Sequence, residues 1–208
     1  MRVPAALPRR RVLVPATAAL AFAVAALGLA LLCPRPPADT SVEAGFARDM
    51  QAHHAQAVQM ALMVRDRTGD REVRTLAYDI ATTQQQIGQM YAWLDMWGLS
   101  QASLQPRMAW MGQSHHNVTK AAPMPGMATA AQIKELEQAD GKDAEVLFLR
   151  LMIPHHQGGV QMAQAAVGSR QPQVRRMAGA VLAAQKAEID LMRRMLAARG
   201  ASETSAAG

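Results

Sequence analysis

A sixteen-residue segment occurs twice in this chain, and the two copies lie 102 positions apart. Residues 46–61 read FARDMQAHHAQAVQMA and residues 148–163 read FLRLMIPHHQGGVQMA, with nine of the sixteen positions identical. The apolar residues of each copy recur with the spacing of an amphipathic helix. A repeated unit of this kind buries its apolar face by packing against its neighbour. The repeat therefore predicts two related helical units packed together.

Signals that begin and end helices place each copy in a helical hairpin. Thr40 and Glu43 form a capping box at the start of the first hairpin, and Gly98 follows its second helix. Asp143 is the expected cap of the second hairpin. No segment shows the apolar alternation of a strand. We therefore expect an all-α fold, a ferritin-like four-helix bundle formed by two duplicated hairpins.

The first 38 residues differ in composition from the remainder. Residues 12–32 carry no charge, and as a helix of ~1.5 Å per residue they would span roughly 30 Å, the thickness of a bilayer core. Four arginines precede this segment and only Arg35 follows closely, so the positive-inside rule places the rest of the chain outside the cytoplasm. A cleaved signal peptide is the alternative. We expect an extracytoplasmic protein, periplasmic or at the cell surface, that is either membrane-anchored through the N-terminal helix or secreted.

The charge distribution argues against nucleic-acid binding. The whole chain has a net charge of +6, but five basic residues and no acidic ones lie before residue 39, and the remainder carries only +1. A basic stripe for phosphate contacts is therefore not evident. The expected organisation is a basic tip, anchor or signal segment and Pro-rich spacer at 1–38, then an exported bundle at 39–208 with hairpins at about 41–98 and 142–199 and a Met/His-rich crossover at 99–128.

All six histidines fall in three adjacent pairs, two of them in the repeat. On a helical wheel, His53 and His54 lie on either side of the apolar stripe, with Met50 beside them. His155 and His156 occupy the same positions in the second copy. Packing of the two hairpins can bring these pairs together in the core, where an unpartnered imidazole costs roughly 1–3 kcal/mol. A metal ion would supply the missing partner.

The combination of fifteen methionines with one cysteine favours a soft metal ion. Imidazole and thioether ligands without thiolate suit Cu(I), with Ag(I) as a second candidate, and thioether sulfur is not a usual ligand of zinc. The candidate ligands in the helices are Met50, His53, His54, Met60, Met152, His155, His156 and Met162. The candidate ligands in the crossover are Met108, Met111, His115, His116, Met124 and Met127. Six other methionines are expected in the core: Met63, Met90, Met96, Met177, Met192 and Met195.

Two alternatives to metal binding remain open. The histidine pairs can be hydrogen-bonded packing in a structural or interaction bundle. A ferritin-like di-iron oxidase is the less favoured alternative, because such sites need several inward carboxylates, including Glu-x-x-His pairs, and this chain has none. We therefore expect a binding protein and no enzyme. Since neutral imidazole is the ligand form, we also expect Cu(I) affinity to fall as the pH drops through roughly 6.5.

Several of these segments resemble a bacterial family called domain of unknown function 305. The resemblance is carried by Met50-x-x-His53-His54, Met124-Pro-Gly-Met127, Met152-Ile-Pro-His155-His156-Gln-Gly and Gln185-x-x-Glu188-Ile-x-x-Met192, and it covers roughly residues 42–197. It implies an exported, ferritin-like four-helix bundle, and copper or silver binding for some members. By position it implicates Met50, His53, His54, Met152, His155, His156 and Met162.

The chain departs from this family pattern at one place. Gln86 stands in the first repeat where Glu188 stands in the second, so a symmetric role for the glutamate is not supported. The expected role is storage, delivery or resistance, with the metal ion as partner and no nucleic acid. Delivery would also involve a copper-handling protein.

Overall fold

The computed structural model describes residues 16–32, 35–112 and 124–204. The chain divides into two compact units, Met1–Arg35 and Pro36–Gly208. The described part of the first unit includes the helix α1 (Ala16–Leu32), whose side chains at Leu20, Phe22 and Val24 are exposed. Within the described ranges, no helix is both long and apolar enough to cross a membrane.

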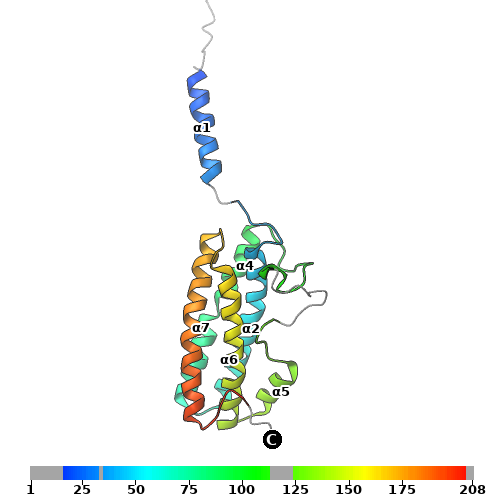
Figure 1. The fold of residues 1–208 in the computed structure, drawn as a ribbon, viewed down its shortest axis with the longest axis vertical. Helices are drawn as coiled ribbons and strands as arrows, with labels where there is room; N and C mark the ends of the chain where they lie inside the picture. Colours follow the sequence, from blue (N-terminus) through cyan, green and yellow to red (C-terminus); the bar gives the residue numbers. More distant parts are fainter. Residues whose placement is uncertain (1–15, 33–34, 113–123, 205–208) are drawn as a thin grey trace, which may run out of the picture. The chain divides into compact units, whose positions relative to one another are not determined.

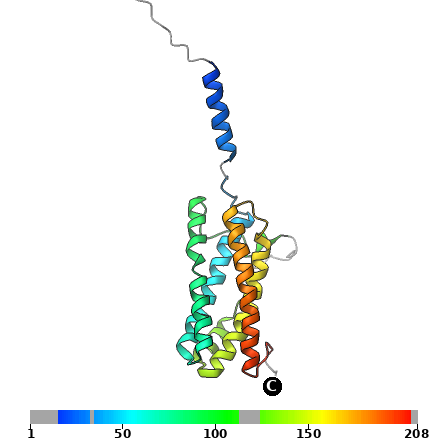
Figure 2. The ribbon, with the colours of Figure 1, turned by 90° about the vertical axis from the view of Figure 1, so that its left-hand side faces the viewer.

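The second unit is a bundle of helices. The elements are α2 (Val42–Arg67), α3 (Arg71–Thr83), α4 (Gln86–Met96), the 3₁₀ helix η1 (Ala109–Met111), α5 (Ala130–Gln138), α6 (Gly141–Ala166) and α7 (Pro172–Ala198). Helices α2, α6 and α7 lie side by side with the consecutive pair α3 and α4 (Figures 1 and 2). The described residues contain no strand. The predicted all-helical fold is therefore confirmed.

Side chains cap the starts of several helices. Asp70 caps α3 by accepting from the Val73 N–H (2.9 Å), and Thr129 forms a capping box at the start of α5. Two predicted caps were wrong. Ser41, and not Thr40, caps α2 through the Ala44 N–H, because its side chain lies three residues before an unpaired first-turn donor. Helix α6 begins at Gly141, so Asp143 lies inside its first turn.

The second helix of the first hairpin is broken, whereas a single continuous helix was predicted. Helix α3 ends at Thr83 and α4 begins at Gln86. Across the break, the N–H groups of Gln85, Ile87 and Gly88 bond to carbonyls three residues back. This is the hydrogen-bond pattern of the tighter 3₁₀ helix.

The tight turn partly offsets a one-residue difference in length between the two hairpins. Ile87 follows Val73 by 14 positions, whereas Ile189 follows Val174 by 15 positions in the unbroken helix α7. A 3₁₀ residue turns the chain by about 120°, and an α-helical residue by about 100°. Each 3₁₀ residue adds about 20° of turn, so the three 3₁₀ bonds of the break recover about 60° of the roughly 100° rotation that one deleted residue would cause in α4.

Two reciprocal hydrogen bonds tie the start of each hairpin to the turn of the other. Ser169, between α6 and α7, donates its hydroxyl to Glu43 of α2 (2.7 Å). Thr68, between α2 and α3, donates its hydroxyl to Glu145 of α6 (2.5 Å). Both carboxylates are buried, and Arg199 also donates to Glu145 (2.7 Å). We call these two contacts the cross-locks.

The bundle interior contains two separate apolar clusters. The Met50 cluster includes Phe46, Met50, Met90, Leu94, Met162 and Val174. The Met60 cluster includes Met60, Val64, Ile80, Phe148, Met152 and Met192. Each long helix contributes to both, so the clusters follow each other along the bundle. Of the methionines predicted in the core, Met96 was wrong: it lies at the end of α4 and is 68% exposed.

Candidate metal centre

Polar side chains separate the two apolar clusters. On α2, His53 and His54 follow Met50 and precede Met60, and the corresponding order recurs on α6. The broken α3–α4 segment contributes Gln84 and Gln86 at this level of the bundle, and α7 contributes Gln185 and Glu188. We call these eight residues the polar layer: His53, His54, Gln84, Gln86, His155, His156, Gln185 and Glu188. All four histidines are at most 1% exposed.

The structure brings the two histidine pairs of the repeat together. The rings of His53 on α2 and His155 on α6 have centroids 3.8 Å apart and planes inclined by 33°. His155 and His156 lie 6.2 Å apart by ring centroid. Residues 102 positions apart in sequence are thus in ring contact at the centre of the bundle.

Hydrogen bonds fix the orientation of the two outer histidines in corresponding ways. The Nε2 atom of His54 lies 3.1 Å from Gln86 Oε1, and the Nε2 atom of His156 lies 2.6 Å from Glu188 Oε2. Both contacts join residues 32 positions apart. With an oxygen facing Nε2, each neutral histidine donates from Nε2 and keeps Nδ1 as a bare lone pair. The carboxylate of Glu188 enforces this arrangement, whereas the amide of Gln86 allows it in the orientation seen here.

His53 is held by the crossover in the same tautomer. Its Nε2 atom lies 3.3 Å from the carbonyl oxygen of Pro125, which again can only accept. The Nδ1 atoms of His53, His54 and His156 have no hydrogen-bond partner, and neither ring nitrogen of His155 has one. A buried acceptor without a partner costs about 1–3 kcal/mol. These orphaned nitrogens are suitable ligands for a soft cation.

Burial keeps His53, His54 and His155 in the neutral form that binds metal. The pKa of His53 is lowered to about 3, mainly by desolvation and also by the charge of His54, while the hydrogen bond to Pro125 acts in the opposite direction. Desolvation also lowers the pKa of His54 to about 4 and holds that of His155 well below 6.5. Protons therefore compete with a metal at His53, His54 and His155 only in acid.

The structure divides the candidate helix methionines between the two sides of the polar layer. Met50 and Met162 are fully buried in the Met50 cluster, whereas Met60 and Met152 are fully buried in the Met60 cluster. Each cluster therefore combines one methionine from α2 with one from α6. In the described ranges, no group of three or more His, Cys, Asp or Glu side chains has the arrangement of a metal site.

The crossover methionines gather at the Met50 cluster. Met108 and Met124 are buried there, and Met111 and Met127 are partly buried against it. Met108 adopts a left-handed backbone conformation (φ 65°), and its N–H donates to Asp49 Oδ2 (2.8 Å). His115 and His116 lie outside the described residues.

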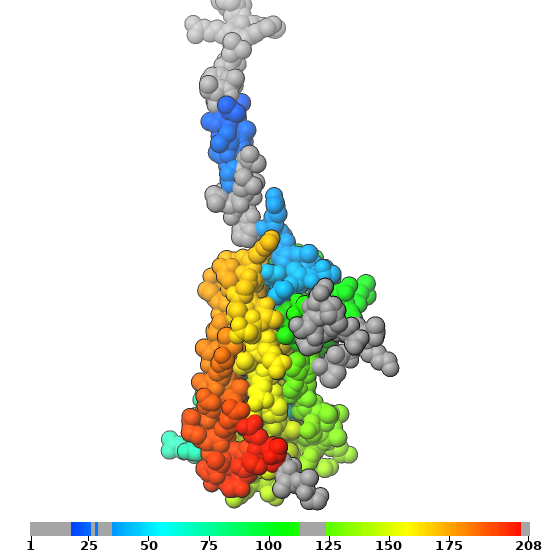
Figure 3. Space-filling view, in the orientation of Figure 1, coloured from blue at the N-terminus to red at the C-terminus, as the bar shows by residue number. Residues whose placement is uncertain are grey.

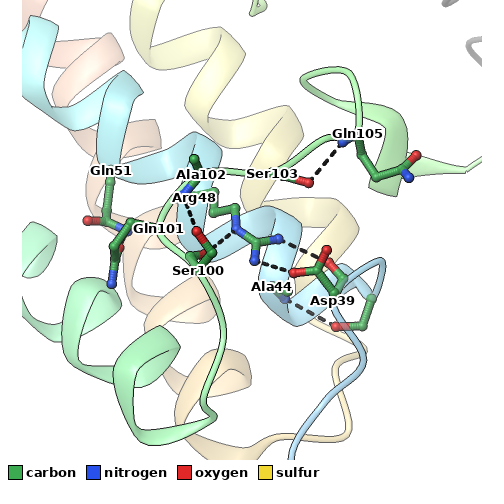
Figure 4. Close-up of polar contacts among 10 residues, drawn as sticks. Asp39, Ala44, Arg48, Gln51, Ser100, Gln101, Ala102, Ser103 and Gln105 are labelled. Carbon is green, nitrogen blue, oxygen red and sulfur yellow. Dashed lines mark hydrogen bonds and ion pairs between the residues drawn. The ribbon is translucent and has the colours of Figure 1, made fainter.

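The first part of the crossover is anchored to the start of α2. Trp110 Nε1 also donates to Asp49 Oδ2 (2.8 Å), and the Trp110 ring packs edge-on against Phe46. Figure 4 shows Arg48 bonded to the carbonyl of Ser100 and to Asp39. The second repeat has Leu151 at the position of Asp49. Asp49 therefore holds the crossover in place and is not part of the repeated site.

The last part of the crossover packs directly on α6. A Cβ atom at Gly158 would overlap the Pro125 carbonyl, and one at Gly126 would overlap the Pro154 carbonyl. Figure 3 shows this segment and α5 lying along the surface of α6. The two glycines thus allow the backbone approach that places the Pro125 carbonyl at His53.

Sequence reasoning missed several members of the polar layer. Gln84 and Gln185 are buried, and both side-chain polar atoms of Gln185 lack a partner. Gln86 and Glu188 were compared by position, but their contacts with His54 and His156 were not foreseen. The available signal was a polar residue at a core-facing position of each helix. The contact of His53 with the Pro125 carbonyl involves a backbone group, so no side-chain pattern in the sequence could have predicted it.

Comparisons with known proteins agree with this architecture. The family model of the domain of unknown function DUF305 matches residues 43–196. A candidate secreted DUF305 protein from Streptomyces coelicolor is 50% identical over 81% of this chain and 99% of that chain, with a TM-score of 0.74. A DUF305 fragment from Deinococcus radiodurans is 35% identical over 78% and 99% of the two chains, with a TM-score of 0.63.

The protein CopM is a more distant structural relative. Its Cu(II)-bound form is 26% identical over 74% of this chain and 95% of that chain, with a TM-score of 0.54. Its Ag-bound form, obtained by co-crystallization, is 26% identical over 75% and 96% of the two chains, with a TM-score of 0.55. Among curated proteins, none matches this chain.

Proposed function

Because this chain belongs to the DUF305 family, we propose that it is an exported protein that binds Cu(I) or Ag(I) through paired histidines and methionines. The observation that carries the proposal is the polar layer. Four buried histidines meet there, and each has at least one ring nitrogen without a partner. Binding serves storage, delivery or resistance, and the metal ion is the cargo.

The ligand types favour a soft monovalent ion. His53 and His155 lie centrally, and Met50 and Met152 precede them by three residues, a spacing that puts both side chains on one helix face. Thioether and neutral imidazole together suit Cu(I) and Ag(I). The Ag-bound form of CopM supports this choice. The crossover methionines Met108, Met111, Met124 and Met127, with His115 and His116, form a second candidate capture site.

Export is part of the proposal. The uncharged segment at residues 12–32 follows four arginines, and the Streptomyces coelicolor relative is described as a candidate secreted protein. Fractionation of cells that produce the full chain tests this. We expect the protein outside the cytoplasm, either released or retained at the membrane, and recovery in the cytoplasm would contradict export.

We also propose that the bundle is ferritin-like and consists of two duplicated hairpins. The corresponding contacts His54–Gln86 and His156–Glu188 support this, as do the reciprocal cross-locks. A crystal structure would test it by superposition of residues 50–60 on residues 152–162. Helical turns that do not superpose would contradict duplication.

Anaerobic titration of the full chain, purified without an affinity tag, tests metal binding. Cu(I) is added in competition with a chelator, and the same titration is repeated on a variant with His53, His54, His155 and His156 changed to Ala. We expect the variant to lose the tightest binding. Circular dichroism of the variant checks that the helices remain.

The competing interpretation is a structural bundle in which the histidines only pack. The hydrogen bonds of His53, His54 and His156 favour it, since packing also requires partners. Metal analysis of the untagged protein separates the possibilities. Copper or silver supports the proposal, iron favours a ferritin-like oxidase, and the absence of any metal together with no Cu(I) binding favours packing. We propose binding rather than catalysis.

A further inference from the structure

The polar layer contains a single carboxylate. Of its eight residues, four are histidines, three are glutamines, and one is Glu188. The Glu188 side chain is 17% exposed and contacts His156 at 2.6 Å. The corresponding contact in the first repeat is the amide of Gln86 with His54, at 3.1 Å. The two halves of the layer therefore share one geometry and differ by one negative charge.

The other buried carboxylates of the described bundle are engaged elsewhere. Asp49 accepts from the Met108 N–H and from Trp110 at the crossover. Glu43 and Glu145 accept hydrogen bonds in the cross-locks, at the ends of the hairpins. Glu188 is thus the only acidic side chain of the described residues that contacts a histidine of the layer.

We propose that Glu188 restricts the polar layer to one monovalent cation and keeps Nδ1 of His156 free to bind it. This inference rests on the proposed function and specifies its selectivity. Four neutral imidazoles, one carboxylate and one Cu(I) or Ag(I) ion sum to zero charge. A divalent ion in the same place leaves one uncompensated positive charge in a buried environment, which is strongly unfavourable.

The same charge balance limits the number of ions. The first monovalent ion neutralises the one carboxylate of the layer. A second monovalent ion would carry the layer to a net positive charge in a buried environment. One ion per polar layer is therefore the expected stoichiometry.

Glu188 is also a positioning residue. A carboxylate has only acceptor atoms, so it holds His156 as the Nε2–H tautomer. The amide of Gln86 can reverse and present its NH₂ group to His54, which then donates from Nδ1 and loses the free lone pair. The tautomer of His156 is therefore fixed with Nδ1 free before a metal binds, whereas the tautomer of His54 is not fixed.

Two matched variants test this on the full chain. Glu188→Gln makes the second half resemble the first, and Gln86→Glu makes the first half resemble the second. The probes are Ag(I), as silver nitrate in chloride-free buffer with a competing ligand, and Cd(II) as a soft divalent ion. We expect Glu188→Gln to weaken Ag(I) binding by about 10–100-fold. We expect Gln86→Glu to strengthen Cd(II) binding by tenfold or more.

A measurement on the metal-free protein provides an independent readout. Nitrogen-15 NMR of the histidine rings should show His156 as one tautomer in the parent and as a mixture in Glu188→Gln. Ag(I) affinity within twofold of the parent in Glu188→Gln overturns the inference and leaves the proposed function standing. If the folded, unsubstituted protein binds neither Ag(I) nor Cu(I), both the inference and the proposed function are wrong. If Glu188→Gln does not fold, unchanged Cd(II) affinity in Gln86→Glu overturns the inference.

Discussion

At the scale of single residues, the four core histidines are unusual because none is exposed and each has an unused nitrogen. Desolvation makes the charged form of a buried imidazole unfavourable, and the neighbouring histidines add to that cost. The neutral form is the one that binds a metal, so the burial that costs stability also prepares the ligands. Two predictions on pH follow from this.

The stability of the metal-free protein should fall as the pH drops below 6.5. The folded-state pKa of His53 is about 3 and that of His54 about 4, so the unfolded chain takes up protons first. Above pH 6.5 these two histidines do not change the free energy of unfolding with pH. Between pH 6.5 and about 3 they lower it progressively. At pH 5 each group should cost about 2 kcal/mol. Urea unfolding at pH 7.5, 6 and 5 measures this, and a constant midpoint would contradict it.

Metal affinity should resist acid better than the sequence suggested. With the ordinary histidine pKa, metal affinity would fall near pH 6.5. Burial lowers the pKa values of His53 and His54 to about 3 and 4. Proton competition at these residues should therefore begin near pH 4. Ag(I) competition titrations at pH 7.5, 6 and 5 on protein shown to be folded check this. A tenfold loss between pH 7.5 and 6 would refute it.

At the scale of elements, the crossover is part of the candidate site. Its last segment places the Pro125 carbonyl on His53, and its methionines pack on the Met50 cluster. Helix α6 accepts this segment because Gly158 leaves room for the Pro125 backbone. Glycine weakens a helix, but Gly158 of α6 lets the crossover pack closely on that helix.

Gly158→Ala should destabilise the protein by about 1–3 kcal/mol, because the added methyl group overlaps the Pro125 carbonyl. The displaced carbonyl should also release His53 from its single tautomer, which ring NMR can detect. The matched control is Gly179→Ala in α7, where an added Cβ meets nothing within 4 Å. The control should gain up to about 1 kcal/mol. Equal effects of the two substitutions in urea unfolding would disprove crossover docking at Gly158.

At the scale of the whole molecule, the cross-locks join the two hairpins at their ends. Each connects the first helix of one hairpin, near its start, to the internal turn of the other, so they hold the register in which the histidine pairs meet. Burial raises the pKa of Glu43, but hydrogen bonds from Ser169 and nearby groups outweigh it and hold the pKa below its ordinary value. The folded state thus favours the charged carboxylate.

Ser169→Ala should cost about 1–3 kcal/mol, because it leaves the buried Glu43 carboxylate without its hydroxyl donor. The cost should be present at neutral pH and shrink as Glu43 becomes protonated below about pH 4.5. A double-mutant cycle with Glu43→Gln measures the coupling. The control is Ser103→Ala, at a half-buried serine whose hydroxyl accepts only a local, solvent-exposed hydrogen bond from the Gln105 N–H, and it should change stability by less than about 0.5 kcal/mol. A coupling energy of zero would show that the cross-lock is incidental.

The sequence by itself determined the helical fold and which faces carry histidine and methionine. Both follow from local physics, since the 3.6-residue period and the caps act within one or two turns of chain. The repeat also predicted that His53 and His155 occupy corresponding places. The broken α3–α4 segment is the local feature that the glycine and cap signals did not reveal.

Only the tertiary structure decided which atoms of the site are free. The partners of His53, His54 and His156 come from 72 or 32 residues away, and one of them is a backbone carbonyl. Packing also divided the methionines between two clusters and set the carboxylate of Glu188 against only one histidine pair. These choices depend on how helices distant in sequence meet, and a helical period carries no information about that.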